Sequence, residues 1–267
     1  MDGLIGIDKH PGPTSHDIVA AIRKMLRIRK AGHCGTLDPD ASGVLLIALG
    51  RATRLTSFLS GHDKAYTGTI RLGLSTDTYD ASGRPTSDPC RDFPERPEIE
   101  RAMREMEGKG LQTPPPFSAK KVAGVRLYRL ARAGQPVVPQ PAVVSIAAFR
   151  LLDYSPPFLR FETRCSAGTY VRSLAHDLGG RLGCGGHLAE LTRTASGPYT
   201  LPACVPLDRL REAAEHGQAE TLLIPLEAML PDVQPFFSMP KMPPGFPTAP
   251  GFLCPASFPP RTTRTRS

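Results

Sequence analysis

The segment from Gly32 to Gly43 combines three glycines, a histidine and an Asp-Pro step. Glycine tolerates positive φ, and Pro39 biases Asp38 away from the helical region, so these residues predict a tight loop. The apolar run Val44–Leu49 follows at once and predicts a buried strand. Such a loop fixes the carboxylate of Asp38 rigidly at the edge of a core. Loop chemistry alone favours a plainer role for Asp38, a turn residue that caps its own backbone.

Two other segments hold side chains that could complete a site. Lys64–Leu74 alternates like a strand and carries Tyr66, for which ordinary cross-strand packing is the local explanation. A helix is predicted from Thr169 to Gly179, and Tyr170 and Arg172 project from different sides of its first turn. On local grounds an arginine at a helix start is more often solvated than functional. These residues therefore need a longer pattern before they can be assigned a role.

The run GHCGTLDPDASGVLLIALGRATR supplies that pattern. It resembles, without gaps, the signature of TruB-type tRNA pseudouridine synthases, which convert uridine to pseudouridine in the T-loop of tRNA. In that signature the Asp of G-T-L-D-P is catalytic, so the resemblance implies that Asp38 is the nucleophile. The family histidine is thought to fill the gap that the flipped nucleotide leaves, and this role falls on His33.

Shorter motifs extend the resemblance. In C-S-A-G-T-Y-V-R the family's tyrosine, here Tyr170, packs beside the target base, and its arginine, here Arg172, pairs with the catalytic Asp. A guanidinium suits that task because its planar fork keeps a carboxylate ionised and oriented. The K-x-Y pattern implies that Tyr66 stacks on the target base, with Lys64 among the substrate-binding residues. In HLAELTRTAS, Leu191 matches a leucine that lines the base pocket.

Two basic segments are candidates for binding RNA phosphates. The first, Arg23–Lys30, leads directly into the Asp38 loop and holds no acidic residue, although a solvated helix end explains it about equally well. The second segment begins QTPPPFSAKK and resembles the mobile thumb insertion that the family closes over RNA. It belongs to a stretch from Gln112 to Leu152 that contains no acidic residue. Because charge of one sign attracts an anionic partner, Lys120 and Lys121 are expected to bind the substrate.

The resemblance also implies the fold and the division into domains. It implies an α+β pseudouridine-synthase fold: a mixed, mainly antiparallel sheet flanked by helices and loops, with a thumb-like insertion at about residues 112–141. The catalytic domain is expected over residues 1–231. The family normally continues into a small RNA-binding PUA domain, but residues 232–267 are rich in proline and show neither strand alternation nor helical period. That composition predicts a disordered tail in place of the domain.

Local patterns predict the elements around these motifs. Helices are predicted after a cap at Thr14 or Ser15 and at Arg51–Leu59, Glu98–Glu107, Arg126–Ala133 and Pro206–His216. Strands are predicted at Leu4–Ile7 and His187–Ser196, and a strand pair at Ala142–Leu152 and Phe158–Cys165.

Composition narrows the class of protein. The chain of 267 residues carries a formal net charge of +8, which suits an anionic partner such as tRNA, although four of those charges fall in Val233–Ser267. Its six cysteines form no C-x-x-C pair, which favours reduced thiols and a cytoplasmic protein over a zinc knuckle or a disulfide framework. The sequence shows no secretory signal and no apolar stretch that could span a bilayer, so no membrane partner is expected.

The implied reaction breaks an N-glycosidic bond, turns the base over and forms a C-glycosidic bond. It consumes neither electrons nor phosphate, so no cofactor and no metal are expected, and the sequence contains no Walker loop or Rossmann fingerprint. The expected partner is the T-arm of tRNA, and the protein is expected to act as a monomer that requires no protein partner.

Two alternatives remain open at this point. The chain could be a non-catalytic tRNA-binding or tRNA-folding protein, but a pure binder has no need of an ionic pair between Asp38 and Arg172. It could also be a guide-RNA-dependent pseudouridine synthase, but the thumb-like segment Gln112–Pro141 favours an enzyme that acts alone.

Overall fold

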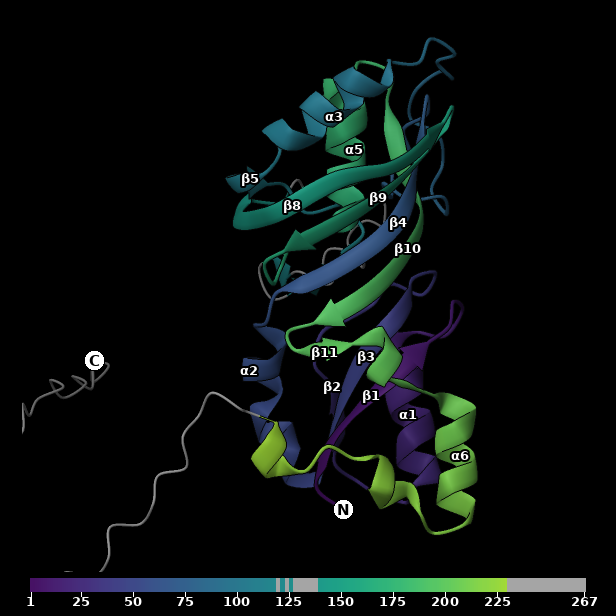
Figure 1. Cartoon of the computed structure of the whole chain (residues 1–267), viewed down its shortest axis with the longest axis vertical. Coiled ribbons are helices and arrows are strands. Elements are labelled where there is room, and N and C mark those ends of the chain that lie inside the picture. The colour runs from purple at the N-terminus through teal and green to yellow at the C-terminus, as the bar shows by residue number, and fades with distance from the viewer. Residues whose placement is uncertain (119–120, 123–124, 127–138, 230–267) are drawn as a thin grey trace, which may run out of the picture. The chain divides into compact units, whose positions relative to one another are not determined.

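A mixed sheet with helices packed on it makes up the part of the chain that the structure describes. The computed structural model describes residues 1–118, 121–122, 125–126 and 139–229 (Figure 1), with the backbone alone for the two short segments. Lys120 and the predicted disordered tail 232–267 lie outside the described residues, as does the predicted helix Arg126–Ala133 except for its first residue. Arg126 pairs with Lys121 in a small separate sheet of β6 (Lys121–Val122) and β7 (Val125–Arg126), so it belongs to a strand and does not start a helix.

The main sheet has ten strands, eight of which follow the order β12-β1-β3-β10-β4-β9-β8-β5, while β2 pairs with β3 and β11 pairs with β10. Their bounds are β1 Gly3–Lys9, β2 Ala31–His33, β3 Ser42–Leu49, β4 Lys64–Leu72, β5 Gly108–Gln112, β8 Ala142–Ser155, β9 Phe158–Cys165, β10 Gly186–Ser196, β11 Tyr199–Thr200 and β12 Val205–Pro206. Among these described strands, β1 with β12 and β3 with β10 are parallel, and the other pairs are antiparallel. The mixed, mainly antiparallel sheet of the predicted α+β fold is confirmed.

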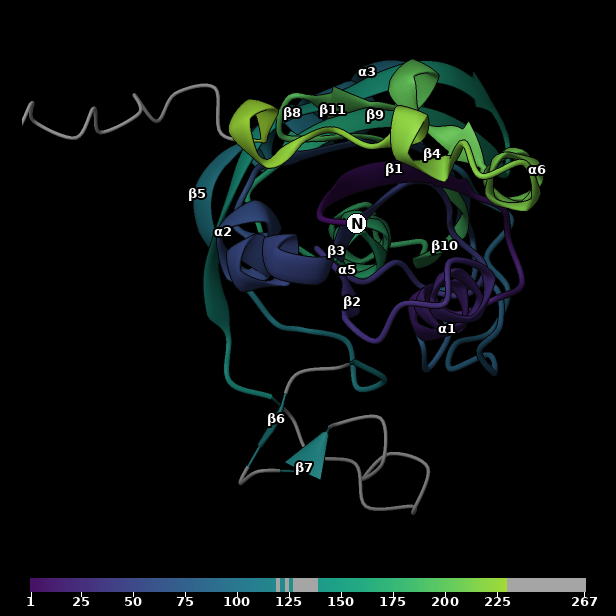
Figure 2. The same cartoon turned by 90° about the horizontal axis from the view of Figure 1, so that it is seen from below.

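Helices cover the sheet at both ends of its strand order. Their bounds are α1 Ser15–Met25, α2 Thr56–Ser60, α3 Arg96–Glu105, α5 Val171–Arg181 and α6 Leu207–Glu215, with short 3₁₀ helices at Gly50–Leu55, Leu201–Ala203, Ala219–Leu222 and Leu226–Ala228. In Figure 2 the sheet arches over α1, α2 and α5. None of the helices in the described ranges is long and apolar enough to cross a membrane.

Local capping decides where these helices begin. A reciprocal capping box of Thr14 and Asp17 starts α1, so the cap is Thr14, one of the two residues that the sequence offers for it. A similar box on Glu95 starts α3 two residues earlier than predicted. The predicted helix Arg51–Leu59 is divided into a 3₁₀ turn and α2, because the hydroxyl of Thr53 donates to the carbonyl of Gly50 and that of Thr56 to the carbonyl of Thr53.

The apolar run that follows the Asp38 loop forms β3, which is buried on both faces. Its alternate residues enter two different clusters: Leu45 and Ile47 pack with α1, whereas Val44 and Leu46 pack with α2. Burial on both faces explains why this strand is continuously apolar. A third cluster lies between α3, α5 and the strands β4, β8 and β9.

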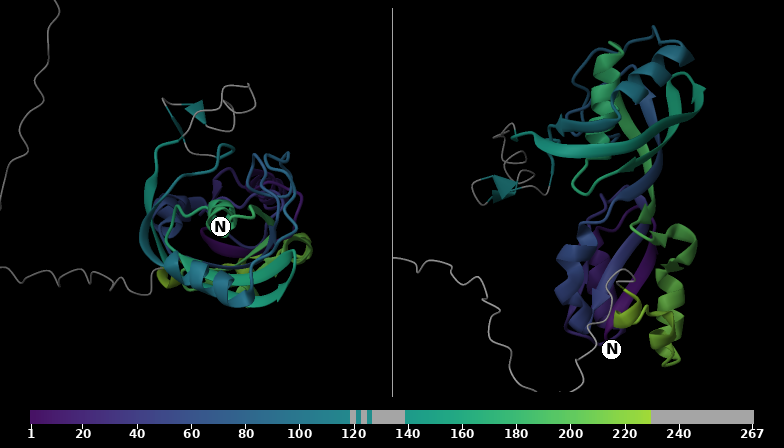
Figure 3. Two further views of the ribbon diagram at one scale, coloured as in Figure 1. Left: turned by 90° about the horizontal axis from the view of Figure 1, so that it is seen from above. Right: turned by 60° about the vertical axis from the view of Figure 1, so that its left-hand side comes forward.

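The two halves of the sheet meet at a short junction. β3 and β10 are joined by two residue pairs in parallel register, Ser42 with Thr192 and Gly43 with Arg193. Gly43 has a φ of +96°, and a Cβ at this position would overlap the backbone carbonyl of Arg193, so glycine is required here. Figures 1 and 3 show β10 running from the half that holds α3 and α5 toward the half that holds α1 and α6. The Asp38 loop ends at this junction.

Two neighbouring glycines in α5 test how closely this helix packs on the sheet. A Cβ on Gly179 would overlap backbone atoms of Gly185 and Gly186, whereas a Cβ on the exposed Gly180 would meet nothing within 4 Å. We expect Gly179→Ala to lower the free energy of unfolding by about 1–3 kcal/mol, the range for overpacking. Gly180→Ala should raise it by up to about 1 kcal/mol because alanine favours the helix. Urea unfolding followed by circular dichroism measures both changes, and equal stabilities of the two variants would contradict the close packing.

Candidate active site

The Asp38 loop connects β2 to β3 and presents its carboxylate to solvent. The amide of Ala41 donates to the carbonyl of Asp38, and the amide of Gly12 donates to that of Pro39, so backbone hydrogen bonds close the predicted tight turn. The side chain of Asp38 is 43% exposed. A carboxylate on a braced loop beside a core can be reached from solvent without the loop having to move.

The buried side chain of Arg172 contacts the carboxylate of Asp38 on the side that faces away from solvent. It lies in the first turn of α5, and its side chain is only 7% exposed. Nη2 donates a hydrogen bond to Oδ1 of Asp38 at 3.1 Å, while Nε lies 2.8 Å from Oδ2 without the alignment of a hydrogen bond, so that second contact is ionic. Both carboxylate oxygens therefore face the same guanidinium, which fixes their orientation.

The rest of the guanidinium is bound by three more partners. Nη1 donates to the carbonyl of Thr78 and Nη2 to the carbonyl of Phe117, both at 3.1 Å. Nη1 also lies 3.4 Å from Oδ2 of Asp80. Asp80 is one of the functional-site residues that sequence reasoning missed. It ends the segment Thr76-Asp77-Thr78-Tyr79-Asp80, which resembles the T-D-T-x-D element of the family and indicates only an ordered loop.

The loop-ordering role of that motif is nevertheless observed. Oδ1 of Asp80 accepts hydrogen bonds from the hydroxyls of Thr78 and Ser82, each at 2.6 Å, and Oδ1 of Asp77 accepts from the amide of Arg84 at 2.8 Å. Asp80 thus shapes its own loop with one oxygen and faces Arg172 with the other.

Three buried side chains support the backbone of the Asp38 loop. The hydroxyl of Ser15 accepts from the amide of Leu37 at 2.8 Å and donates to its carbonyl at 3.0 Å. Nζ of Lys9 donates to the carbonyls of Pro39 and Ala41 at 2.8 and 2.7 Å. The guanidinium of Arg193 donates to carbonyls at both ends of the loop. None of the three was predicted as a site residue, because nothing in their local sequence marks them.

Two predicted residues, Tyr66 and Leu191, lie beside the junction of the sheet, whereas a third, Tyr170, contacts Gln112 of β5. Tyr66 is buried on β4, where it pairs with Arg193 of β10. Burial raises the pKa of its hydroxyl, and the positive charge of Arg193 opposes that rise. Leu191 is half-buried and packs against core clusters of both halves of the sheet. Tyr170 is the residue just before α5, and its backbone amide and carbonyl are both bound by the side chain of Gln112.

The remaining predicted residues have different surroundings. His33 is half-buried on β2, and burial, together with the positive charge of Arg193, lowers the pKa of its imidazole. Lys64 is buried, its Nζ donates to the carbonyl of His62 at 2.6 Å, and burial lowers its pKa to about 8. Lys121 lies in β6, where only its backbone is described, and Lys120 lies outside the described residues.

The base of the predicted thumb is tied to the same helix turn that carries Arg172. The side chain of Gln112 binds Tyr170, and the hydroxyl of Ser173 donates to the carbonyl of Thr113 at 2.8 Å. With the hydrogen bond from Arg172 to the carbonyl of Phe117, these bonds attach the described start of the predicted thumb to three residues at the beginning of α5, Tyr170, Arg172 and Ser173.

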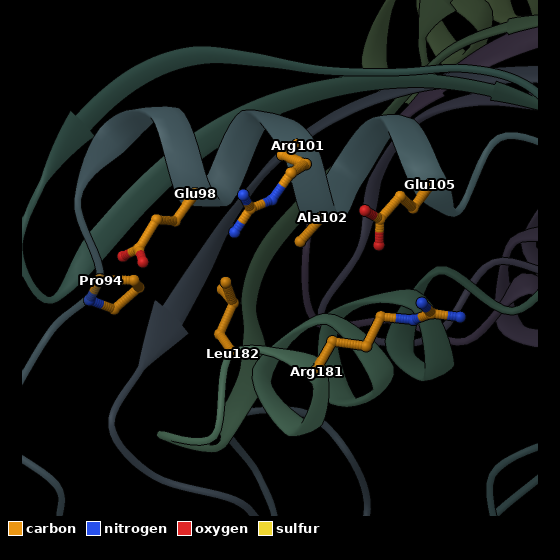
Figure 4. Close-up of a pocket in the computed structure, with 7 residues that line it drawn as sticks. All are labelled: Pro94, Glu98, Arg101, Ala102, Glu105, Arg181 and Leu182. Carbon is orange, nitrogen blue, oxygen red and sulfur yellow. The ribbon is translucent and has the colours of Figure 1, made fainter.

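A separate surface pocket of about 460 Å³ lies between α3 and the far end of α5. Figure 4 shows Glu98, Arg101 and Glu105 of α3 facing Arg181 and Leu182. Arg181 is nine positions after Arg172, or roughly 13 Å along the helix, so the pocket is distinct from the Asp38 site. In the described part of the chain no three His, Cys, Asp or Glu side chains converge to hold a metal ion.

Known proteins are similar to this chain over most of its length. The model of the TruB family pseudouridylate synthase N-terminal domain matches residues 23–171, and that of the tRNA pseudouridylate synthase B C-terminal domain matches residues 172–231. The chain is 45% identical over 252 residues to the tRNA pseudouridine synthase B of Geobacillus kaustophilus (strain HTA426), and the match covers 90% of this chain and 85% of that protein. It is 43% identical over 231 residues to the protein of the same name from Solibacter usitatus (strain Ellin6076), where the match covers 86% and 79%.

Solved structures share the fold. The chain matches one from a Cbf5-Nop10-Gar1 complex with a TM-score of 0.67 and 34% identity, and one from an H/ACA RNP bound to a substrate RNA containing 2′-deoxyuridine with 0.65 and 30%. Each match covers 85% of this chain but 60% of the solved chain, so this chain spans less than two thirds of their length. Because the two family models together cover residues 23–231 and the curated relatives are more than 40% identical, the chain belongs to the TruB family of pseudouridylate synthases.

Proposed function

We propose that this protein isomerises uridine to pseudouridine in the T-loop of tRNA. The observation that carries the proposal is the contact between Asp38 and Arg172, in which a buried guanidinium holds a solvent-facing carboxylate. This carboxylate is the Asp of the G-T-L-D-P motif. Relatives named tRNA pseudouridine synthase B support tRNA as the substrate.

The chemistry assigns different tasks to the two members of the pair. Isomerisation breaks the N1–C1′ bond, forms a C5–C1′ bond, and replaces the proton lost from C5 by one gained at N1. Asp38 supplies an ionised carboxylate at the sugar, because its 43% exposed side chain is open to a nucleotide. Arg172 acts through Asp38, since its planar guanidinium orients the carboxylate.

The surrounding residues would hold the extracted nucleotide. Tyr66 stacks on the target base, and Tyr170 and Leu191 line the pocket beside it. His33 fills the space that the nucleotide leaves in the T-loop, which offsets part of the few kcal/mol that unstacking costs. Lys64 adds positive charge beside the site, and Lys120 and Lys121 bind phosphates from the thumb.

One experiment separates this proposal from its two alternatives. Unmodified tRNA is incubated with the purified protein without any guide RNA, and pseudouridine is then mapped at single-nucleotide resolution. Pseudouridine in the T-loop supports the proposal. Tight binding without modification would identify a tRNA-binding protein, and modification that needs an added guide would identify a guide-dependent synthase.

We further propose that the protein works in the cytoplasm as a monomer without a protein partner. The proposal that no protein partner is needed is supported by the composition of the site, because a single chain supplies Asp38, Asp80, Tyr66 and Arg172. The mapping experiment uses the purified chain alone, so it also tests whether a partner is needed.

Replacing the carboxylate tests the centre of the mechanism. We expect Asp38→Asn to lower the single-turnover rate by at least about 10³-fold, because a neutral amide cannot replace an ionised nucleophile. Affinity for tRNA should stay within a few-fold. The matched control is Asp40→Asn, which removes an exposed carboxylate two positions later in the same loop and should leave the rate unchanged. Substantial turnover by Asp38→Asn would remove Asp38 from the mechanism.

Replacing the guanidinium tests its role as an orienting group. Arg172→Lys keeps the charge but loses the planar fork that reaches both oxygens of Asp38 and two backbone carbonyls. We expect the rate at saturating tRNA to fall by about 10²-fold, the typical effect of misplacing a reacting group by about 1 Å. Arg181→Lys, at the other end of α5, is the control. Near-wild-type turnover by Arg172→Lys would show that the pairing is unimportant.

The basic segment Arg23–Lys30 is expected to bind phosphates. Arg29 and Lys30 are exposed just before β2, so replacing both with Gln should weaken tRNA binding. The slope of log K against log salt should become shallower by about 0.7–0.9 for each phosphate that the variant no longer binds. The control replaces the exposed Arg101 and Arg104 of α3 with Gln. If both double variants keep the wild-type slope, Arg29 and Lys30 are simply solvated.

A further inference from the structure

Arg193 is a buried cation at the junction of the two halves of the sheet. It lies on β10 and is 1% exposed. In the ranges that the structure describes, no carboxylate lies within ion-pair distance of its guanidinium. Burying an unpaired charge is costly, and proteins offset that cost by hydrogen-bonding every donor.

The hydrogen bonds of Arg193 go to the backbone on both sides of Asp38. Nη2 donates to the carbonyl of Gly35 at 3.1 Å and Nη1 to that of Thr36 at 3.3 Å, shortly before Asp38 in the chain. Nε donates to the carbonyl of Val44 at 2.7 Å, where β3 has begun. One rigid, planar group therefore sets the separation between the two ends of the loop.

The same residue joins the loop to the neighbouring strand that carries Tyr66. The backbone of Arg193 pairs with Gly43 of β3 on one side and with Tyr66 of β4 on the other. Its positive charge also lies near the Tyr66 hydroxyl. Any change in the position of residue 193 would therefore move the loop and Tyr66 relative to one another.

Other groups hold the loop together without Arg193. Ser15 binds the backbone of Leu37, and Lys9 binds the carbonyls of Pro39 and Ala41, all in the middle of the loop. The middle of the loop thus has its own supports, and the distinct contribution of Arg193 is the placement of the whole loop against β4.

We propose that Arg193 is a positioning residue for catalysis. Its guanidinium fixes the position of the Asp38 loop relative to Tyr66 on β4. The carboxylate of Asp38 and the base stacked on Tyr66 then lie in the arrangement that the reaction needs. This inference rests on the proposed function, because it assigns Asp38 and Tyr66 their roles in pseudouridine formation. Arg193 itself does not touch the substrate. Its effect appears in the rate of the chemical step and not in the affinity for tRNA.

Arg193→Lys is the test, with Arg160→Lys on the exposed face of β9 as the matched control. Lysine retains the charge but cannot donate in a fixed fork to three separate carbonyls. The single-turnover rate at saturating tRNA is measured per binding-competent enzyme, which is counted by titration with tRNA. We expect this rate to fall by about 10²-fold while the dissociation constant for tRNA stays within about threefold. The control should match the wild type in both.

Several results would overturn the proposal. A rate within threefold of the wild type would show that the fork is not needed. A loss of rate fully explained by a smaller binding-competent fraction, or a variant without cooperative melting, would assign Arg193 to folding alone. Failure of the wild-type protein itself to form pseudouridine in the same assay would instead contradict the proposed function, so the two failures are distinguishable.

Discussion

The two-residue parallel pairing between β3 and β10 is the constraint on which the rest of the structure depends. Ser42 and Gly43 end the Asp38 loop and pair with Thr192 and Arg193. Asp38 belongs to one half of the sheet, whereas Arg172 and Tyr66 belong to the other. A shift at this junction would therefore change the distance between Asp38 and its partners. Gly43 makes the junction possible, since its missing Cβ lets the two backbones approach.

Three buried cationic side chains near that junction determine the electrostatic potential of the site. Lys9, Lys64 and Arg193 are all buried, and they bind backbone carbonyls; within the described ranges no carboxylate is in ion-pair distance of any of them. Carbonyl dipoles offset part of the cost of burying these charges but leave their net charge in place. The resulting positive potential attracts the phosphates of an approaching RNA.

The first turn of α5 binds two other segments of the site, the loop that contains Asp80 and the described start of the predicted thumb. Arg172 binds the carbonyls of Thr78 and Phe117, and Ser173 binds that of Thr113. The loop that contains Asp80 and the described start of the thumb are therefore fixed to the same turn that orients Asp38. In this arrangement the position of the Asp38–Arg172 pair and the attachment of the predicted thumb depend on one another.

Local patterns in the sequence determined most of the elements and the candidate chemistry. The apolar run Val44–Leu49 predicted β3, and a cap at Thr14 or Ser15 predicted the start of α1. The motifs identified Asp38 and Arg172 through the family resemblance. The predictions of β3 and α1 were possible because helix capping and strand burial depend on residues that are close together in the chain. Where the sequence misjudged local structure, as at Arg51–Leu59, hydroxyl groups that bond to nearby carbonyls divided the helix.

Only the tertiary structure decided which residues support that chemistry. From its motif, Asp80 was expected to order a loop; its second contact, with Arg172, exists because that loop packs on α5. Arg193 looked like any arginine in a strand until the sheet order placed it between Gly43 and Tyr66. The pairs that build the site are far apart in the chain, 134 positions for Asp38 with Arg172 and 149 for Val44 with Arg193. No local pattern encodes such pairs, because strand order and register bring them together.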